Sequence, residues 1–418
     1  MPTKKSKSDD PAAEPAKKPE KPRKKKKKVE EEEVPKTTHQ LISDMVGAGV
    51  RVFSGSELIT PQRIRRPLGI PSVDVEIAGG FPGAAISNIW GPPSACKTWG
   101  AFRTLTQQQK IFGDDFVGVY ISLGLHPDIS FARLHGLQVP YESEAERQHF
   151  IQTYYGIHGS PPTDRLVEHA GQKVGQLFVL FPEEEVRTGK GQTMELNSKP
   201  LERLFASTVE ISRSRLCQMI VVDDIGGMPT QDRLSKTMSD EPKVADHARV
   251  LSQWVTRMAL TLQMVGTNTF NYTSLLTLSQ VRLSIGSYGG YQPVSSTAMN
   301  HLLGTALSFK LDGSAQGGTT QEKKRINWKI TKGKHGHSDG ATGNFFFYPS
   351  TGVDYISDLF TTAKKYNILE TGGSVVQFEG TKRKGHDDFK DAMADDADLA
   401  KAIHDKLISV KCPGALFR

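Results

Sequence analysis

Hydrophobic residues of this chain gather in short runs that alternate with longer segments of mixed polarity. Five apolar runs predict strands, at Ala85–Trp90, Phe116–Ser122, Gln176–Phe181, Gln218–Val222 and Leu275–Leu278. The segments between them are long enough for crossover helices. Strands that alternate with helices indicate βαβ units, so we expect an α/β fold with a mostly parallel twisted sheet flanked by helices.

Changes in composition along the sequence divide the chain into four expected parts. Residues 1–38 are rich in Pro, Lys and Glu and nearly devoid of large apolar side chains, which predicts a disordered tail. Residues 39–66 follow, with a helix expected over Leu41–Val50. Residues 67–345 form the expected core, with a polar surface insertion at 141–172. Residues 346–418 form an expected small α+β domain that ends in a helix.

The net charge of +7 is concentrated in the tail. Residues 1–38 hold thirteen Lys or Arg and eight Asp or Glu, a balance of +5, and the other 380 residues carry only +2. The basic run Arg23–Lys28 is compatible with a nuclear localisation signal, an arm that tethers nucleic acid, or a solubilising tail. The charge of the whole chain therefore says little about what the core binds.

Three cysteines lie far apart and form neither a disulfide framework nor a zinc motif. The sequence contains no apolar run of membrane-spanning length and no secretory signal. We therefore expect a reducing, cytoplasmic location, with nuclear targeting by the basic run as the open alternative.

The strongest local motif lies between an expected strand and an expected helix and reads Gly91-Pro-Pro-Ser94-Ala95-Cys96-Lys97-Thr98. Backbone N–H groups of such a loop cradle phosphates, a lysine reaches the β- and γ-oxygens, and a hydroxyl holds Mg²⁺. Lys97 and Thr98 fit the last two roles, which predicts binding of ATP with Mg²⁺.

Cys96 departs from the GxxxxGK[ST] pattern, because it stands where that pattern has its second glycine. A positive φ at this position would strain any residue other than glycine. A thiol at a helix N-terminus beside Lys97 is also expected to have a lowered pKa. The alternative for Cys96 is a small packed side chain.

A second motif, Met219–Asp224, is an apolar strand that ends in the carboxylates of Asp223 and Asp224. This pattern holds Mg²⁺ opposite a phosphate-binding loop. A core strand with an acidic end by chance is the alternative. Two such motifs in this order favour an ATPase, with Lys97, Asp223 and Asp224 as candidate catalytic residues.

The chain from about Leu68 to Ile408 resembles the RecA-type recombinases, as a divergent member with features of the phage UvsX-like branch. The segments that carry the resemblance are Leu68–Asp74, Ala78–Pro82, Ile86–Thr98, His126–Gly136, Leu278–Arg282, Thr331–Lys334 and Gly372–Gly380. The resemblance implies a RecA-like P-loop ATPase core, a polymerisation segment at 39–66 and a small C-terminal domain. It also implies filaments on single-stranded DNA, homologous pairing with double-stranded DNA, strand exchange and recombinational repair.

The same resemblance implies roles for individual residues around the nucleotide. Gln280 would sense the γ-phosphate and couple it to a DNA-binding loop. Lys332 and Lys334 would reach across the filament interface to the ATP of a neighbouring copy. Asp128 and Phe131 would contact adenine.

Two further segments are similar to the DNA-contacting loops of the family, at Met228–Arg249 and Arg282–Asn300. Arginines would contact phosphates and tyrosines would stack on bases. The candidate DNA-binding residues are Arg249, Arg257, Arg282, Tyr288 and Tyr291. For each of them an ordinary surface residue is the alternative.

Gly124 occupies the position of the glutamate that polarises water in this family. Without that carboxylate we expect weak or atypical DNA-dependent ATPase activity, unless Asp224 replaces it. This departure leaves two other functions open. One is a hydrolysis-deficient RecA-like paralogue that acts as a mediator or scaffold on DNA, and the other is a ring-forming motor of the same fold.

Overall fold

The computed structural model describes residues 37–46, 63–123, 126–162, 176–181, 200–227, 230, 246–263, 271–283, 291–312, 323–334 and 336–417. The expected disordered tail lies outside these residues, apart from its last two positions. The chain divides into two units, Met1–Ser54 and Gly55–Arg418. In the first unit, helix α1 spans Thr38–Val46 and overlaps the predicted helix, whose last four residues are not among those described.

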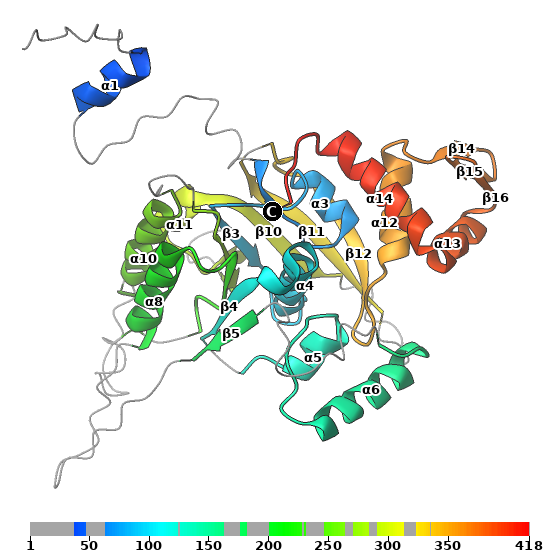
Figure 1. The fold of residues 1–418 in the computed structure, drawn as a ribbon, viewed down its shortest axis with the longest axis horizontal. Helices are drawn as coiled ribbons and strands as arrows, with labels where there is room; N and C mark the ends of the chain where they lie inside the picture. The colour runs from blue at the N-terminus through cyan, green and yellow to red at the C-terminus, as the bar shows by residue number, and fades with distance from the viewer. Residues whose placement is uncertain are drawn as a thin grey trace, which may run out of the picture. The chain divides into compact units, whose positions relative to one another are not determined.

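A nine-stranded sheet forms the centre of the second unit, in the order β13-β12-β11-β10-β3-β7-β6-β4-β5 (Figure 1). Six neighbouring strands are parallel: β10 (Leu303–Leu311), β3 (Ile86–Trp90), β7 (Ser274–Ser279), β6 (Met219–Asp223), β4 (Val117–Ser122) and β5 (Gln176–Leu180). Three antiparallel strands extend the sheet: β11 (Lys324–Gly333), β12 (Thr342–Tyr348) and β13 (Gly352–Val353). All five strands predicted from apolar runs are confirmed, each within one residue of its expected bounds.

Helices cover both faces of this sheet because its central strands are apolar on both sides. In β6, Met219 and Val221 belong to one buried cluster, and Ile220 and Val222 belong to another. The first cluster packs under α4 (Lys97–Phe112), and the second under α8 (Pro200–Ser214) and α10 (Asp246–Gln263). Continuous apolar strands of this kind are typical of parallel sheets buried on two faces.

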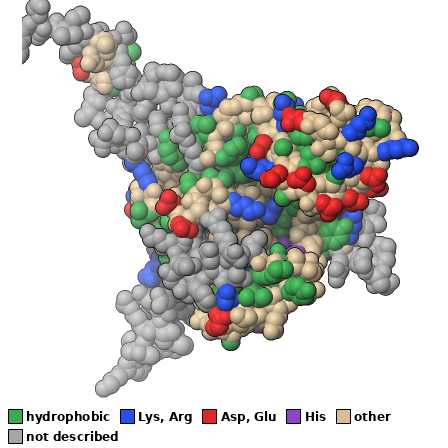
Figure 2. Space-filling view, turned by 45° about the vertical axis from the view of Figure 1, so that its right-hand side comes forward, with side chains coloured by type: hydrophobic (Ala, Val, Ile, Leu, Met, Phe, Trp, Pro, Cys, Tyr) green, Lys and Arg blue, Asp and Glu red, His purple; other side chains and the backbone are tan. Residues whose placement is uncertain are grey.

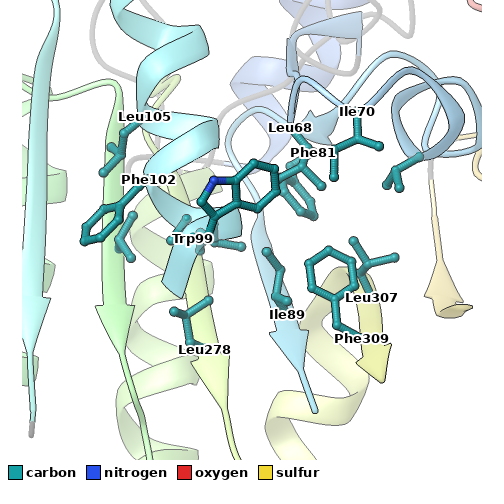
Figure 3. Close-up of a cluster of buried hydrophobic side chains, with 14 of the residues drawn as sticks. Leu68, Ile70, Phe81, Ile89, Trp99, Phe102, Leu105, Leu278, Leu307 and Phe309 are labelled. Carbon is teal, nitrogen blue, oxygen red and sulfur yellow. The ribbon is translucent and has the colours of Figure 1, made fainter. Parts of the chain in front are cut away.

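Helix α4 is held against the strands by large side chains. Figure 3 shows Trp99, Phe102 and Leu105 of this helix together with residues of β3, β7 and β10. Phe309 of β10 is fully buried in the same cluster, and its ring lies 5.5 Å from that of Phe345. The packing fixes the first turn of α4 relative to the ends of the strands.

Shorter elements surround this core. Strands β1 (Arg65–Arg66) and β2 (Phe81–Pro82) pair with each other, as do β8 (Val281–Leu283) and β9 (Tyr291–Pro293). The short helices are α3 (Pro71–Glu76), the 3₁₀ turn η2 (Gly113–Asp115), α5 (Ile129–Leu134) and α11 (Thr297–Leu302). The expected surface insertion carries α6 (Glu144–His158).

The C-terminal part of the chain has its own buried cluster. It contains α12 (Tyr355–Lys365), a sheet of β14 (Glu370–Gly372), β15 (Val375–Phe378) and β16 (Thr381–Lys384), then α13 (His386–Asp395) and α14 (Ala397–Lys411). The expected boundary between residues 345 and 346 falls inside β12, which pairs with β11 of the large sheet. Strand β13 also pairs with β12, so the large sheet continues past the expected boundary.

Two polar contacts attach α12 to α3. The backbone N–H of Ser72 donates to Asp358 at 2.8 Å, and the ammonium of Lys365 donates to Glu76 at 2.8 Å. Tyr366 also donates its hydroxyl to Glu76. Among the described helices, none is long and apolar enough to cross a bilayer.

Removal of the Phe309 ring tests the packing under α4. We expect Phe309→Ala to lower the free energy of unfolding by about 3–5 kcal/mol, because it leaves a cavity in a fully buried cluster. Urea denaturation of the whole chain measures this change. Leu260→Ala, at a side chain that is 61 % exposed, is the matched control and should change it by less than about 0.5 kcal/mol. Equal effects of the two substitutions would contradict the proposed packing.

Candidate functional site

The carboxyl ends of parallel strands bring the predicted nucleotide residues to one edge of the sheet. Trp90 at the end of β3 is level with Ser279 at the end of β7, and Ser122 of β4 is level with Asp223 of β6. The backbone N–H of Gly91 donates to the carbonyl of Ser279 at 3.2 Å. The loop 91–96, Asp223 and Gln280 therefore share this edge, which we call the loop edge.

The loop between β3 and α4 is tightly constrained at its first residue. A Cβ atom on Gly91 would lie 2.1 Å from the carbonyl oxygen of Phe309, so no side chain fits there. Ser94 and Cys96 both have positive φ, at 62° and 61°. Cys96 thus adopts the left-handed conformation that favours glycine, and it does so immediately before the first residue of α4.

The expected lowering of the Cys96 pKa is wrong. Burial raises the pKa of this thiol to about 11, and the nearby charges of Lys324 and Lys97 offset only part of that rise. Desolvation disfavours the thiolate more than the two ammonium groups favour it. At neutral pH the group is a thiol that packs against the core cluster.

The side chain of Lys97 folds back over the loop. Its Nζ donates to the carbonyl oxygens of Gly91 at 3.0 Å and Pro92 at 2.8 Å. Burial lowers the pKa of Lys97, and the carboxylates of Asp223 and Asp224 oppose that shift. The ammonium is thus held at the centre of the loop, where a phosphate oxygen would meet it.

Thr98 and Asp223 bring a hydroxyl and a carboxylate together beside this loop. The Thr98 Oγ1 donates to Asp223 Oδ2 at 2.8 Å, and the hydroxyl of Tyr120 donates to the same oxygen at 2.6 Å. Burial raises the pKa of Asp223, and these two hydrogen bonds oppose that rise. Hard oxygen ligands of this kind suit Mg²⁺, which takes one or two carboxylates and completes its shell with phosphates and water.

Tyr120 was not among the residues that the sequence singled out. It lies in the apolar run that became β4, where a tyrosine is indistinguishable from a core aromatic residue. Its side chain is buried against Phe102, and only its hydroxyl reaches Asp223. The parallel pairing of β4 with β6, which places the two strand ends together, is the signal that would have found it.

Asp224 is half-buried and follows Asp223 through a cis peptide bond. Its Oδ1 accepts the backbone N–H of Gly226 at 2.7 Å, so one carboxylate oxygen serves the turn after β6. Gly124, the position where the family's glutamate is expected, lies outside the described residues.

The other residues expected to contact the nucleotide are Gln280, Asp128 and Phe131. Gln280 is exposed directly after β7. Asp128 caps the N-terminus of α5 by accepting the N–H of Phe131 at 2.9 Å. The ring of Phe131 packs edge-on against His135 at 4.3 Å between centroids.

Lys332 and Lys334 lie at the end of β11, and Lys332 is level with Ala306 of β10 and so with Asn88 in the middle of β3. Strand β11 runs antiparallel to β10, so its last residues are level with the first residues of β10. Lys332 Nζ donates to the carbonyls of Asn300 and His301, the latter at 3.0 Å, and Lys334 Nζ donates to His301 at 3.1 Å. Both ammonium groups therefore point toward the residues before β10 and away from the loop 91–96, which begins three residues beyond Asn88.

The candidate DNA-binding residues are spread over two regions. Arg249 and Arg257 lie on α10, eight residues and therefore about 12 Å apart along the helix. Arg249 is paired with Asp246 at 2.6 Å, and Arg257 is exposed beside the groove between α8 and α10. Most of the first expected loop, Met228–Arg249, lies outside the described residues.

The second expected loop contains more regular structure than the sequence indicated. Arg282 lies in β8 and Tyr291 in β9, which pair antiparallel, and α11 begins at Thr297. Regular structure thus occupies residues 282–283, 291–293 and 297–300 of this expected loop. Residues 284–290, which include Tyr288, lie outside the part of the chain that the structure describes.

Comparison with known proteins gives distant but extensive similarities. No family model matches the chain. Protein RecA 2 of Myxococcus xanthus is 23 % identical over 347 residues, which cover 82 % of this chain and 79 % of that protein. Protein RecA of Nautilia profundicola is 21 % identical over 346 residues, covering 82 % and 81 %. Protein RecA of Francisella tularensis subsp. novicida is 23 % identical over 354 residues, with the same coverage.

The chain is thus similar to RecA proteins at 21–23 % identity over 82 % of its length. The similarity supports a RecA-type family, and the mostly parallel sheet flanked by helices is consistent with a RecA-like core. None of these three relatives is a phage protein. The phage-like features of the sequence therefore stay a prediction.

Substitution of Gly91 tests the constraint on the loop. We expect Gly91→Ala to displace the loop from the carbonyl of Phe309, and so to weaken ATP binding and lower the melting temperature. Nucleotide titration and thermal unfolding measure the two effects. Gly156→Ala is the control, because a Cβ on this helical glycine has no neighbour within 4 Å. It should raise the stability by up to about 1 kcal/mol, through the better helix propensity of alanine. Unchanged nucleotide affinity in Gly91→Ala would contradict the role of this loop.

Proposed function

We propose that the protein is an ATP-dependent DNA recombinase that forms filaments on single-stranded DNA for homologous pairing, strand exchange and recombinational repair. The observation that carries this proposal is the loop edge. A phosphate-loop sequence, a strand-end Asp223 and Gln280 meet there, in a chain similar to RecA proteins over 82 % of its length.

In this proposal the loop binds the phosphates of ATP through its backbone N–H groups and Lys97. Thr98 and Asp223 would hold Mg²⁺, which neutralises phosphate charge when bound. Tyr120 orients the Asp223 carboxylate by donating a hydrogen bond to one of its oxygens. Asp128 and Phe131 would contact the base, and Gln280 would respond to the γ-phosphate.

Hydrolysis depends on a group that orients the attacking water. Gly124 cannot supply a carboxylate, and Asp224 is the acidic residue next to the proposed metal ligand. One oxygen of Asp224 accepts the N–H of Gly226, which fixes the direction of the carboxylate. We therefore infer slow turnover through Asp224, with ATP acting mainly as a switch for assembly.

The position of Lys332 and Lys334 supports a role between copies of the chain. Both ammonium groups donate to carbonyls at the end of α11, before β10 begins, and so are directed away from the loop of the same chain. A neighbouring copy stacked head to tail would present its loop to these lysines. Contacts of this heterologous kind generate open filaments.

Single-stranded DNA would be bound through Arg249, Arg257, Arg282, Tyr288 and Tyr291. The arginines supply phosphate contacts, and the tyrosines supply faces on which bases stack. Double-stranded DNA would enter as the second partner in pairing.

A hydrolysis-deficient paralogue that acts as a mediator or scaffold on DNA is the second candidate. Two observations favour it: glycine at position 124, and a cysteine in a left-handed conformation where the phosphate-loop pattern has glycine. Both candidates bind ATP and DNA, and strand exchange distinguishes them.

The recombinase proposal predicts joint molecules between single-stranded and homologous duplex DNA, with ATP and with a non-hydrolysable analogue alike. Lys97→Ala should form none with either nucleotide, because loss of a charge-assisted contact lowers ATP affinity by about ten- to a hundredfold. A strand-exchange assay with gel readout measures this.

Lys390→Ala, at an ammonium on α13, is the control and should behave like the unmodified chain. If the unmodified chain forms no joint molecules with either nucleotide, the recombinase proposal is contradicted and the scaffold is favoured. An ATPase rate that Asp224→Asn leaves unchanged would remove the role proposed for Asp224.

The role of Lys332 between copies gives a separate prediction. Lys332→Ala should weaken ATP-dependent filament assembly on single-stranded DNA by about tenfold or more, because a charged contact to phosphate is lost. It should leave nucleotide affinity of the DNA-free chain unchanged. Electron microscopy and nucleotide titration measure the two quantities. Lys329→Ala, at an exposed residue of the same strand, is the matched control. If Lys332→Ala lowers the nucleotide affinity of the DNA-free chain as much as it lowers filament assembly, Lys332 belongs to the nucleotide site of its own chain instead.

A further inference from the structure

A pocket of about 420 Å³ lies along α4 and contains none of the loop residues 91–98. Its walls come from α4, from the C-terminal end of α5, from α6 and from residues 351–355 after β12. Asp128 and Phe131, the expected adenine contacts, do not line it either. The pocket is therefore separate from the proposed ATP site.

Several polar atoms that line this pocket are buried without a partner. Trp99 is 3 % exposed, and its indole N–H has no acceptor. Gln138 is 8 % exposed, and its side-chain oxygen has no donor. The Nε of Arg103 and the Nε2 of His158 are likewise shielded from solvent and unpartnered. Buried polar groups are normally hydrogen-bonded, so each of these atoms needs an explanation.

The charge of the pocket is positive and poorly compensated. Arg103 and Lys110 line it, and among the described lining residues there is no carboxylate. The carboxylate that acts on the charge of Arg103 is Asp74, whose two oxygens accept the N–H groups of Leu68 and Gly69, each at 2.7 Å. Burial also raises the pKa of Asp74 to about 7, so at neutral pH it carries only part of a negative charge.

The two cations disfavour each other. The pKa of Lys110 falls to about 8, through desolvation and the charge of Arg103, although the residue is exposed. Burial lowers the pKa of His135 to about 4, and Arg103 contributes to that shift. Figure 2 shows Lys and Arg side chains with histidine nearby in a recess on this face of the molecule. An anion placed between Arg103 and Lys110 would relieve this repulsion.

The size and the aromatic wall of the pocket narrow the class of anion. A volume of about 420 Å³ lies within the range of small-molecule sites and exceeds what a bare phosphate group fills. The rings of Tyr154 and His158 stack at 4.0 Å between centroids on the α6 side, and Tyr355 lines the opposite wall. Guanidinium and ammonium groups are the usual partners of phosphate oxygens.

We propose that this pocket is a second ligand site, which binds a phosphate-bearing small molecule of nucleotide size through Arg103, Lys110 and the Trp99 indole. The phosphate group lies against the two cations, and the Trp99 N–H and His158 face the rest of the ligand. Trp99 lies two residues after Lys97 in the first turn of α4. A ligand bound at Trp99 therefore acts on the ATP loop through this helix turn. The proposal does not depend on DNA binding or on recombinase activity.

Calorimetric titration of the full chain carrying Lys97→Ala tests the proposal, because that substitution weakens phosphate binding at the loop 91–96. The probes are AMP, pyrophosphate and inorganic phosphate. At least one of them should bind, and Arg103→Gln added to Lys97→Ala should weaken that binding by about tenfold or more. Tighter binding of AMP than of phosphate identifies a nucleotide as the ligand class, and equal binding identifies the phosphate group alone.

Lys110→Gln is a second test that does not depend on how the Arg103 variant folds. It changes an exposed side chain and should also weaken binding. Circular dichroism checks that both variants keep the fold. Lys401→Gln, at an exposed residue of α14, is the matched control and should leave binding unchanged. The proposal is overturned if no probe binds at millimolar concentration, or if folded Arg103→Gln and Lys110→Gln variants bind as tightly as the control.

Discussion

The parallel pairing of β3 with β10 on one side and with β7 on the other is the constraint on which the loop edge depends. It places the carbonyl of Phe309 against Gly91 and the carbonyl of Ser279 within hydrogen-bond distance of the Gly91 N–H. The loop therefore leaves the sheet in one direction only. Because β6 pairs with the other side of β7, Asp223 lies at the same edge although β3 and β6 do not pair with each other.

Burial and hydrogen bonding act in opposite directions on the charged groups at this edge. Desolvation raises the pKa of Asp223 and lowers that of Lys97, so burial alone would neutralise both. The hydroxyls of Tyr120 and Thr98, and the mutual attraction of the two groups, favour their charged forms instead. The Tyr120 hydroxyl thus helps to keep Asp223 charged, although Tyr120 is not itself a proposed ligand of the metal.

Patterns within short contiguous segments predicted the parts of the fold that depend on those segments alone. The five central strands are apolar on both faces and bounded by polar segments, so their runs are visible without knowledge of their partners. The loop 91–98 is likewise contiguous. Strand β11 was not predicted, although the alternation of polar and apolar residues in Asn327–Lys332 is a local signal for a half-buried strand. Its place between β10 and β12 is not a local property, and the same pairing carries the large sheet past the expected boundary at residue 345.

The errors at the site have a common physical origin in burial. The pKa of Cys96 was misjudged because its charged neighbours are visible in the sequence, whereas its desolvation is a property of the packed core. Tyr120 was overlooked because only the pairing of two strands shows where its hydroxyl points. The pocket beside Arg103 needs four separate segments to form, and no single segment signals it.

The contacts of Lys332 and Lys334 with Asn300 and His301 have one more consequence. These carbonyls are at the C-terminal end of α11, so the two ammonium groups act as the cationic cap of that helix. An ammonium drawn toward a phosphate at an interface must release the helix end that it holds. Phosphate contact and helix capping are then mutually exclusive, and α11 is joined through only a few residues to the β8–β9 segment that contains Arg282.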